Sequence, residues 1–297
     1  MSIVVWNKGE VALVINQDAS RVPQHMKRLR LLARKYKLHL KMVEGPDFDY
    51  AVREALSDKH LKRLIVGGGD GSVNKAASLI LRLKSKAELA VLPLGTANYY
   101  AKSLGIGKKL DRAFDVALGS KTQKRHVCKA NNREFLIGVN VGTTSRMFSE
   151  VTDEEKQRIG KLAYFRGVFR VLRRTDPPDI TVEVHGKKHT YRSTELVVLN
   201  QNIQDRIKLL PDISGTEPYF EIITYGIGKS KLSPLFAVSI FVLTFGRNQK
   251  YLKRIRATEA RIKSRQDLPV AIDGDVLEHL PLHIQLLSTP VSFCTLE

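Results

Sequence analysis

Cysteines and long hydrophobic runs are scarce in this 297-residue chain. Two cysteines, Cys128 and Cys294, are too few for a disulfide-stapled scaffold, and they suit a reduced cytoplasm. The longest apolar run, Leu235 to Phe245, is interrupted by two hydroxyl residues and is too short to span a bilayer. The N-terminal residues lack both a basic segment and a small-residue cleavage site, so we expect no signal peptide. The sequence therefore predicts a globular, cytoplasmic protein.

Acidic residues are also few, because 30 aspartates and glutamates face 49 lysines and arginines, which leaves a net charge of +19. The excess is clustered. Residues 21–41 contain eight basic residues and no acid, and residues 247–265 contain eight basic residues against Glu259 alone. Such clusters favour polyanionic partners, namely nucleotide phosphates, an anionic membrane surface or nucleic acid, with simple solubility as the alternative.

The first 120 residues alternate between strand-like and helix-like patterns. Val11 to Asn16 has the composition of a short buried strand, and apolar residues at helical spacing follow it. The pattern then repeats, with strands expected at 38–43, 61–66 and 89–95 and helices at 23–36, 49–58, 72–83 and 96–104. This alternation predicts a mostly parallel sheet covered by helices.

After Thr122 the rhythm changes to strand-like runs separated by turns, at 134–142, 179–186, 188–201, 219–226, 267–275 and 282–287. Two helical inserts are expected, near 154–174 and 232–243. The second half therefore predicts a β-rich sandwich. We place an α/β domain at 1–122 and a β-sandwich domain at 123–297, with the alternative that the last strand returns to the first domain.

Glycine gathers at one place, in the stretch LIVGGGDGSVNKAA from Leu64 to Ala77. A strand that ends in a glycine turn and opens a helix exposes backbone N–H groups and a partial positive charge, which suits a phosphate. A second such turn, at Gly95, follows the next strand, so both turns are expected at one sheet edge. The alternatives are a tight connection without a ligand, and Asp70 as the cap of its own helix.

Motifs in this order resemble the diacylglycerol kinase catalytic-domain family, especially its small bacterial lipid kinases. Gly68 to Ser72 matches the motif G-G-D-G-T, Pro93 to Asn98 matches P-x-G-T-x-N, and Asn16 matches the first residue of N-P. Later, Gly160 to Tyr164 reads G-K-L-A-Y, and Asp273 to Asp275 matches D-G-E. The resemblance covers nearly the whole chain and implies an NAD kinase-like, three-layer α/β nucleotide-binding domain followed by a β-sandwich lipid-substrate domain.

The resemblance also implies roles for individual residues. ATP, with Mg²⁺, would be held by Asn16, Gly68, Gly69, Asp70, Gly71, Ser72, Gly95, Thr96 and Asn98. Asp273 would act as the general base on a lipid hydroxyl, and Asp275 would be a second carboxylate near the metal–nucleotide. Glu217 and the carbonyl of Tyr219 would stand at a structural cation site.

Two residues depart from the family pattern inside the nucleotide motifs, since Lys75 replaces a glutamate and Tyr99 an aspartate. With these departures, the function implied is an ATP-dependent lipid kinase, acting on a diacylglycerol-like hydroxyl at an anionic membrane surface, cytoplasmic and peripherally membrane-associated. The alternatives are a kinase for a soluble, NAD-like acceptor and a nucleotide- or lipid-binding protein that has lost turnover. No motif supports nucleic acid as the partner, and a homodimer remains open.

Overall fold

The computed structural model describes residues 10–142, 177–193, 195–201, 213–225 and 252–296. The chain forms two compact units, one made of residues 1–127 with 288–297 and the other of residues 128–287. The helices expected near 154–174 and 232–243 lie outside the described residues, as does the segment G-K-L-A-Y. Each unit is described by itself below.

The first unit is built on a six-stranded sheet in the order β2-β1-β3-β4-β18-β5. Its strands are β1 (Val11–Asn16), β2 (Leu40–Val43), β3 (Arg63–Gly68), β4 (Glu88–Pro93), β5 (Thr122–Arg125) and β18 (Val291–Cys294). They pair in parallel, except that β5 runs antiparallel to β18. The C-terminal strand therefore belongs to this sheet and lies beside β4.

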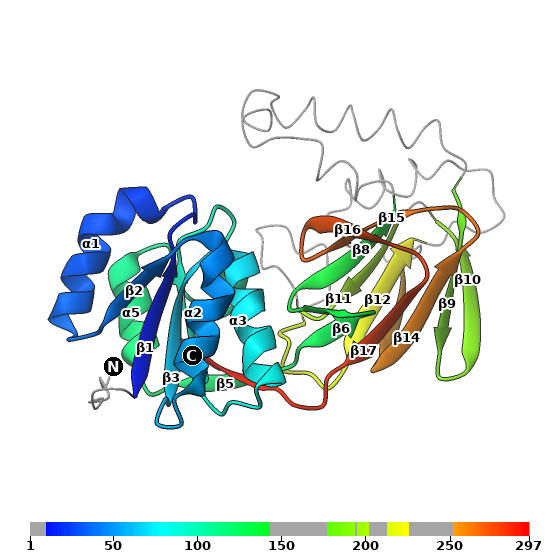
Figure 1. Ribbon diagram of the computed structural model, residues 1–297. Coiled ribbons are helices and arrows are strands. Elements are labelled where there is room, and N and C mark those ends of the chain that lie inside the picture. Colours follow the sequence, from blue (N-terminus) through cyan, green and yellow to red (C-terminus); the bar gives the residue numbers. More distant parts are fainter. Residues whose placement is uncertain (1–9, 143–176, 194, 202–212, 226–251, 297) are drawn as a thin grey trace. The chain divides into compact units, whose positions relative to one another are not determined.

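Helices cover both faces of this sheet, which gives three layers (Figure 1). They are α1 (Val22–Lys35), α2 (Gly45–Ser57), α3 (Asp70–Arg82), α4 (Tyr99–Ser103) and α5 (Leu110–Leu118). Helix α1 packs with α5, and α2 packs with α3 on the opposite face. Because both faces are covered, the central strand β3 is buried throughout and has no polar side chain from Leu64 onward.

The second unit consists of two antiparallel sheets of six strands each, in the orders β10-β9-β14-β17-β6-β7 and β13-β12-β11-β8-β15-β16. The strands are β6 (Cys128–Ala130), β7 (Arg133–Phe135), β8 (Gly138–Gly142), β9 (Asp179–Val184), β10 (Lys187–Arg192), β11 (Glu195–Leu199), β12 (Phe220–Tyr225), β13 (Leu252–Ala257), β14 (Glu259–Ser264), β15 (Pro269–Ile272), β16 (Asp275–His279) and β17 (Leu282–Leu286).

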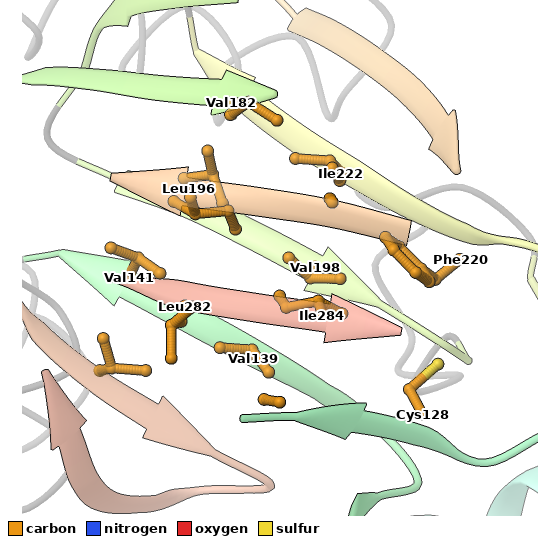
Figure 2. Packing of buried hydrophobic residues seen from close by; sticks show 14 of the residues in the cluster. Cys128, Val139, Val141, Val182, Leu196, Val198, Phe220, Ile222, Leu282 and Ile284 are labelled. Carbon is orange, nitrogen blue, oxygen red and sulfur yellow. The ribbon is translucent and has the colours of Figure 1, made fainter. Parts of the chain in front are cut away.

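One hydrophobic cluster joins the two sheets of the second unit. Figure 2 shows part of it, with Val139, Leu196 and Ile222 contributed by one sheet and Val182 and Ile284 by the other. Strand β9 illustrates why the pattern folds this way, since its even-numbered apolar residues are buried and its odd-numbered polar residues are not. The predicted fold class, an α/β unit followed by a β-rich sandwich, is confirmed.

Candidate functional site

A cavity of about 420 Å³ lies in the first unit, where β1, β3 and β4 end. Its lining residues are Asn16, Asp18, Ala19, Ser20, Gly69, Gly71, Ser72, Lys75, Gly95 and Thr96. Six of the nine residues expected to hold the nucleotide are among them. The carboxyl ends of parallel strands are the usual place for a ligand in an open α/β sheet.

The glycines around this cavity are there for different reasons. A Cβ atom built on Gly67 would come within 2.2 Å of the Ile15 side chain, and one on Gly68 within 2.4 Å of Ser72 Oγ. A Cβ atom on Gly95 would come within 2.4 Å of the Cα atom of Gly69. Contacts inside the protein therefore account for Gly67, Gly68 and Gly95, and the contact at Gly95 shows that the turns after β3 and β4 touch backbone to backbone.

Gly71 is different, because a Cβ atom at this position meets nothing within 4 Å. It is exposed, lines the cavity and belongs to the first turn of α3. No side chain caps the N-terminus of α3, whose N-cap is Gly69. The backbone N–H groups of this turn and the positive end of the helix dipole suit an anion. The open space at Gly71 is thus the part of the glycine cluster that contacts within the protein do not explain.

Asp70 does not cap its own helix. Its carboxylate accepts hydrogen bonds from the backbone N–H groups of Tyr99 at 3.1 Å and Tyr100 at 2.8 Å, which are the first residues of α4. It therefore caps the neighbouring helix and ties the turn after β3 to the turn after β4. Asp70 is not among the described residues that line the cavity, but its hydrogen bonds hold together the two turns that do.

Asn98 closes the second turn in a similar way. Its Oδ1 accepts a hydrogen bond from the Gly95 N–H at 2.9 Å, and its Nδ2 donates to the Gly95 carbonyl at 2.5 Å. Asn98 itself has a φ of +50°, in the left-handed region that asparagine tolerates better than most residues. The asparagine at this position thus fixes a turn whose backbone lines the cavity.

Polar side chains from the end of β1 complete the rim. Asn16 Nδ2 donates to Ser72 Oγ at 3.1 Å, and Asn16 Oδ1 accepts from the Asp18 N–H at 3.1 Å. The hydroxyls of Ser20 and Thr96 lie 3.0 Å apart across the rim. Asp18 and Ser20 also line the cavity but belong to none of the predicted motifs, although their closeness to Asn16 in the sequence was a usable signal.

Lys75, the lysine that replaces a family glutamate, also lines the cavity. It follows Gly71 by one turn of α3, so it lies on the same face of that helix. Its Nζ is 3.4 Å from Asp49 Oδ1 on α2, and both side chains are about half exposed. This ion pair is weak at such exposure and leaves the lysine able to reach an anion.

Asp273 lies in the second unit, in the two-residue turn between β15 and β16. Asp273 and Gly274 both have positive φ values, +50° and +95°, as a type I′ hairpin turn requires. The Asp273 carboxylate accepts hydrogen bonds from the backbone N–H groups of Leu136, Ile137 and Gly138, each at 2.9 Å. Asp273 is thus a turn residue whose carboxylate also anchors the start of β8.

The other acid of this turn has a different environment. Asp275 is 65% exposed at its side chain and forms a 2.8 Å ion pair with Arg133 of β7. Nearby, burial raises the pKa of the Cys128 thiol well above its ordinary value, and the charge of Asp273 adds to the rise. Cys128 is therefore held as a neutral thiol and supplies no nucleophile.

Glu217, expected at a cation site, is engaged locally. Its carboxylate accepts hydrogen bonds from the backbone N–H groups of Ser214 and Gly215, both at 3.0 Å. The guanidinium of Arg256 lies over the ring of Tyr219, with its Cζ atom 4.8 Å from the ring centroid. A second carboxylate close by, that of Glu221, is 1% exposed and accepts from two arginines. The positive charge beside Tyr219 thus comes from Arg256.

Among the described residues, no group of three or more histidine, cysteine, aspartate or glutamate side chains is arranged to hold a metal ion. No helix in this part of the chain is both long and apolar enough to cross a membrane.

Comparisons with known proteins agree on one family. Residues 10–130 match the model described as the diacylglycerol kinase catalytic domain. Diacylglycerol kinases from Staphylococcus aureus, strains bovine RF122 / ET3-1 and Newman, are each 28% identical to this chain over 223 residues, which is 73% of this chain and 69% of theirs.

Solved structures give the same picture for the fold. A diacylglycerol kinase from Bacillus anthracis str. Sterne superposes with a TM-score of 0.75 at 19% identity, over 98% of both chains. A second structure from that organism, itself assigned to this kinase class provisionally, superposes with a TM-score of 0.80 at 21% identity, over 97% of this chain and 95% of the other. At these identities the superpositions establish the fold.

Proposed function

Because residues 10–130 match the diacylglycerol kinase catalytic domain, we propose that this chain belongs to that family and is an ATP-dependent lipid kinase. It transfers the γ-phosphoryl group of ATP to the hydroxyl of a diacylglycerol-like lipid. The observation that carries the nucleotide part is the uncapped N-terminus of α3, which opens at Gly71 onto the cavity.

The cavity residues fit a polyphosphate. Backbone N–H groups at the start of α3 approach the phosphates where Gly71 leaves room, and Lys75 supplies a positive charge one helical turn further on. The hydroxyls of Ser20 and Thr96 and the amide of Asn16 offer further polar contacts on the rim. Phosphoryl transfer depends mainly on such positioning and charge stabilisation.

A magnesium ion is part of the proposal, because Mg²⁺ bound to ATP offsets the negative charge of the phosphates. Mg²⁺ is commonly held by one or two carboxylates together with phosphate oxygens and water. Asp18 is the one acid among the described residues that line the cavity. Its Oδ2 accepts from the Gly45 N–H at 2.6 Å, which fixes the carboxylate. We assign Asp18 as the carboxylate for this ion.

Asp273 is the proposed general base. A lipid hydroxyl attacks a phosphorus atom readily only if its proton has an acceptor within hydrogen-bond reach. The three N–H groups that hold the Asp273 carboxylate fix its direction. Asp275, at the start of β16, is the proposed second carboxylate of the reaction. The acceptor lies in a bilayer, so the enzyme works in peripheral association with a membrane.

The direct test uses the purified full chain, radiolabelled ATP, Mg²⁺ and a panel of acceptors separated by chromatography. The panel holds diacylglycerol, a sphingoid base, phosphatidylglycerol and an isoprenoid alcohol in uncharged detergent micelles, with NAD as the soluble acceptor. Labelled phosphatidic acid is the expected product. Label on NAD alone would replace the lipid acceptor, and ATP binding without transfer to any acceptor would indicate a protein that has lost turnover.

The Asp273→Asn variant tests the base. Turnover is expected to fall about a hundredfold or more, the usual scale for general-base catalysis, while ATP affinity stays the same. The asparagine NH₂ group meets at least one of the three backbone N–H donors, so the variant also loses stability. Thermal unfolding must therefore be measured beside turnover. Asp267→Asn is the matched control, because this side chain is 70% exposed and lies outside that hydrogen-bond set. Full turnover in folded Asp273→Asn would exclude this role.

A further inference from the structure

Helix α1 carries the largest group of basic side chains on a single helix of the described structure, and an exposed leucine lies in the middle of it. Leu31 is 53% exposed, although most large hydrophobic residues of this unit are buried. On an α-helix, residues three and four positions away flank it, and these are Lys27, Arg28, Arg34 and Lys35. All four are exposed, and α1 has no acidic residue.

The opposite face of α1 explains why Leu31 points outward. Val22, Leu29, Leu32 and Ala33 are the buried residues of this helix. They occupy the face that packs onto the sheet, on the side opposite α2 and α3 (Figure 1). Leu31 lies about half a turn away from that stripe, so it makes no contribution to the core. An apolar side chain in solvent among cations is available to a partner outside this fold.

Few of the α1 cations are neutralised within the protein. Arg28 pairs with Asp111 of α5. Lys27 and Arg34 make no ion pair with any residue that the structure describes. The second basic segment of the sequence differs, because Arg254 and Arg256 there share the buried carboxylate of Glu221.

We propose that this face of α1, made of Leu31 with Lys27, Arg28, Arg34 and Lys35, docks the protein on an anionic bilayer. Basic side chains near a membrane surface are attracted to anionic headgroups, and an apolar side chain between them enters the headgroup–acyl boundary. The inference rests on the proposed function, since a lipid acceptor lies in a bilayer. A nucleic-acid backbone would use the cations but leave Leu31 without a partner.

Another charged surface provides the matched control. Lys188, Arg261 and Lys263 line a hollow of about 460 Å³ on the outer face of β9, β10 and β14, but two acids, Asp179 and Glu183, lie among them. Substituting these three of its four basic residues with glutamine changes the net charge as much as the three substitutions on α1. Leu83, 43% exposed at the end of α3, is the control for Leu31.

The experiment is co-sedimentation of the full chain with vesicles of phosphatidylcholine alone or with phosphatidylglycerol added. Each near-surface basic residue strengthens such binding about fivefold, so the combined Lys27→Gln, Arg34→Gln, Lys35→Gln variant is expected to lose on the order of a hundredfold. Leu31→Gln is expected to lose roughly five- to tenfold. The Leu83→Gln variant should bind like wild type.

The combined Lys188→Gln, Arg261→Gln, Lys263→Gln variant should lose far less than the α1 variant, and circular dichroism checks that every variant is folded. Equal losses for the two charge variants, or wild-type binding by both α1 variants, would overturn the assignment. So would α1-dependent binding to duplex DNA stronger than binding to vesicles.

If wild type binds no vesicle, docking is refuted, while lipid phosphorylation in uncharged detergent micelles still reports on the kinase function independently. If the protein phosphorylates no acceptor but binds vesicles through α1, docking is upheld and the kinase function is refuted.

Discussion

Two alanine substitutions at glycines of the same cavity should have opposite effects. In Gly95→Ala, the new Cβ atom would come within 2.4 Å of Gly69 Cα, whereas carbon atoms normally pack at about 3.5–4.0 Å. The turns after β3 and β4 must then separate by about 1 Å. Overpacking of this kind costs about 1–3 kcal/mol, or roughly 2–10 °C in the unfolding temperature of a unit this size.

In Gly71→Ala, the new Cβ atom meets nothing within 4 Å, and the residue lies in the first turn of a helix. Alanine is a better helix former than glycine, so stability should stay the same or rise by up to about 1 kcal/mol. If the phosphates lie against this turn, the methyl group occupies their space. Loss of one charge-assisted hydrogen bond, worth about 1.5–3 kcal/mol, would weaken ATP binding roughly ten- to a hundredfold.

The assay is thermal unfolding and titration calorimetry with ATP and Mg²⁺ on both variants and on Gly107→Ala. Gly107 is exposed, has open space around its Cβ position and does not line the cavity. The Gly107→Ala variant should therefore keep the unfolding temperature and the ATP affinity of the wild type. Gly95→Ala should lose both, and Gly71→Ala should lose ATP binding alone. Wild-type ATP affinity in Gly71→Ala would refute the placement of phosphates at the start of α3.

Four further outcomes follow from the structure. Burial raises the pKa of the Cys294 thiol to about 12 and that of Cys128 well above its ordinary value, so neither thiol should react with an alkylating reagent at pH 8 until its unit opens; rapid labelling of native protein would contradict this. Between the ordinary thiol pKa and these raised values the unfolded chain alone ionises, so stability should fall as the pH rises above about 9. Asp70→Asn replaces one of two accepted hydrogen bonds by a donor facing a donor, and should lower stability by about 1–2 kcal/mol and weaken ATP binding, whereas an unchanged melting curve would show that the link between the two turns is dispensable. Lys75→Glu places a carboxylate opposite Asp49 and beside the phosphates, so ATP should bind less tightly; calorimetry showing tighter binding would contradict this placement.

The fold could be predicted because its signals are local. The periods of apolar residues distinguish strands from helices in both halves, and a glycine turn follows β3 as well as β4. The partner of the last strand could not be chosen that way. Strand β18 joins β4 and β5 across more than 160 residues of chain, and nothing within Val291 to Cys294 distinguishes one buried sheet from another.

At the site, residue types pointed to the right loops but not to what each residue does. Asp70 looks like a cap of α3 from its position, yet it caps α4, because the turn that follows β4 lies against it. Gly95 looks like a phosphate contact, yet the backbone of Gly69 already explains it. Such assignments depend on contacts between distant parts of the chain. The role of Asp273 remains a proposal, since its hairpin geometry fits both a turn residue and a base.

The two positions that lack the family's acids differ in how they reach the site. Tyr99 takes part through its backbone N–H, so a change of side chain does not by itself release Asp70. Lys75 takes part through its side chain, and with it the cavity keeps Asp18 as the one acid among its described lining residues. A lysine there favours the phosphates, which are negative, and disfavours a metal ion, which is positive. The lysine is therefore compatible with tight ATP binding. We expect it to raise the Mg²⁺ concentration that the reaction needs and to lower turnover.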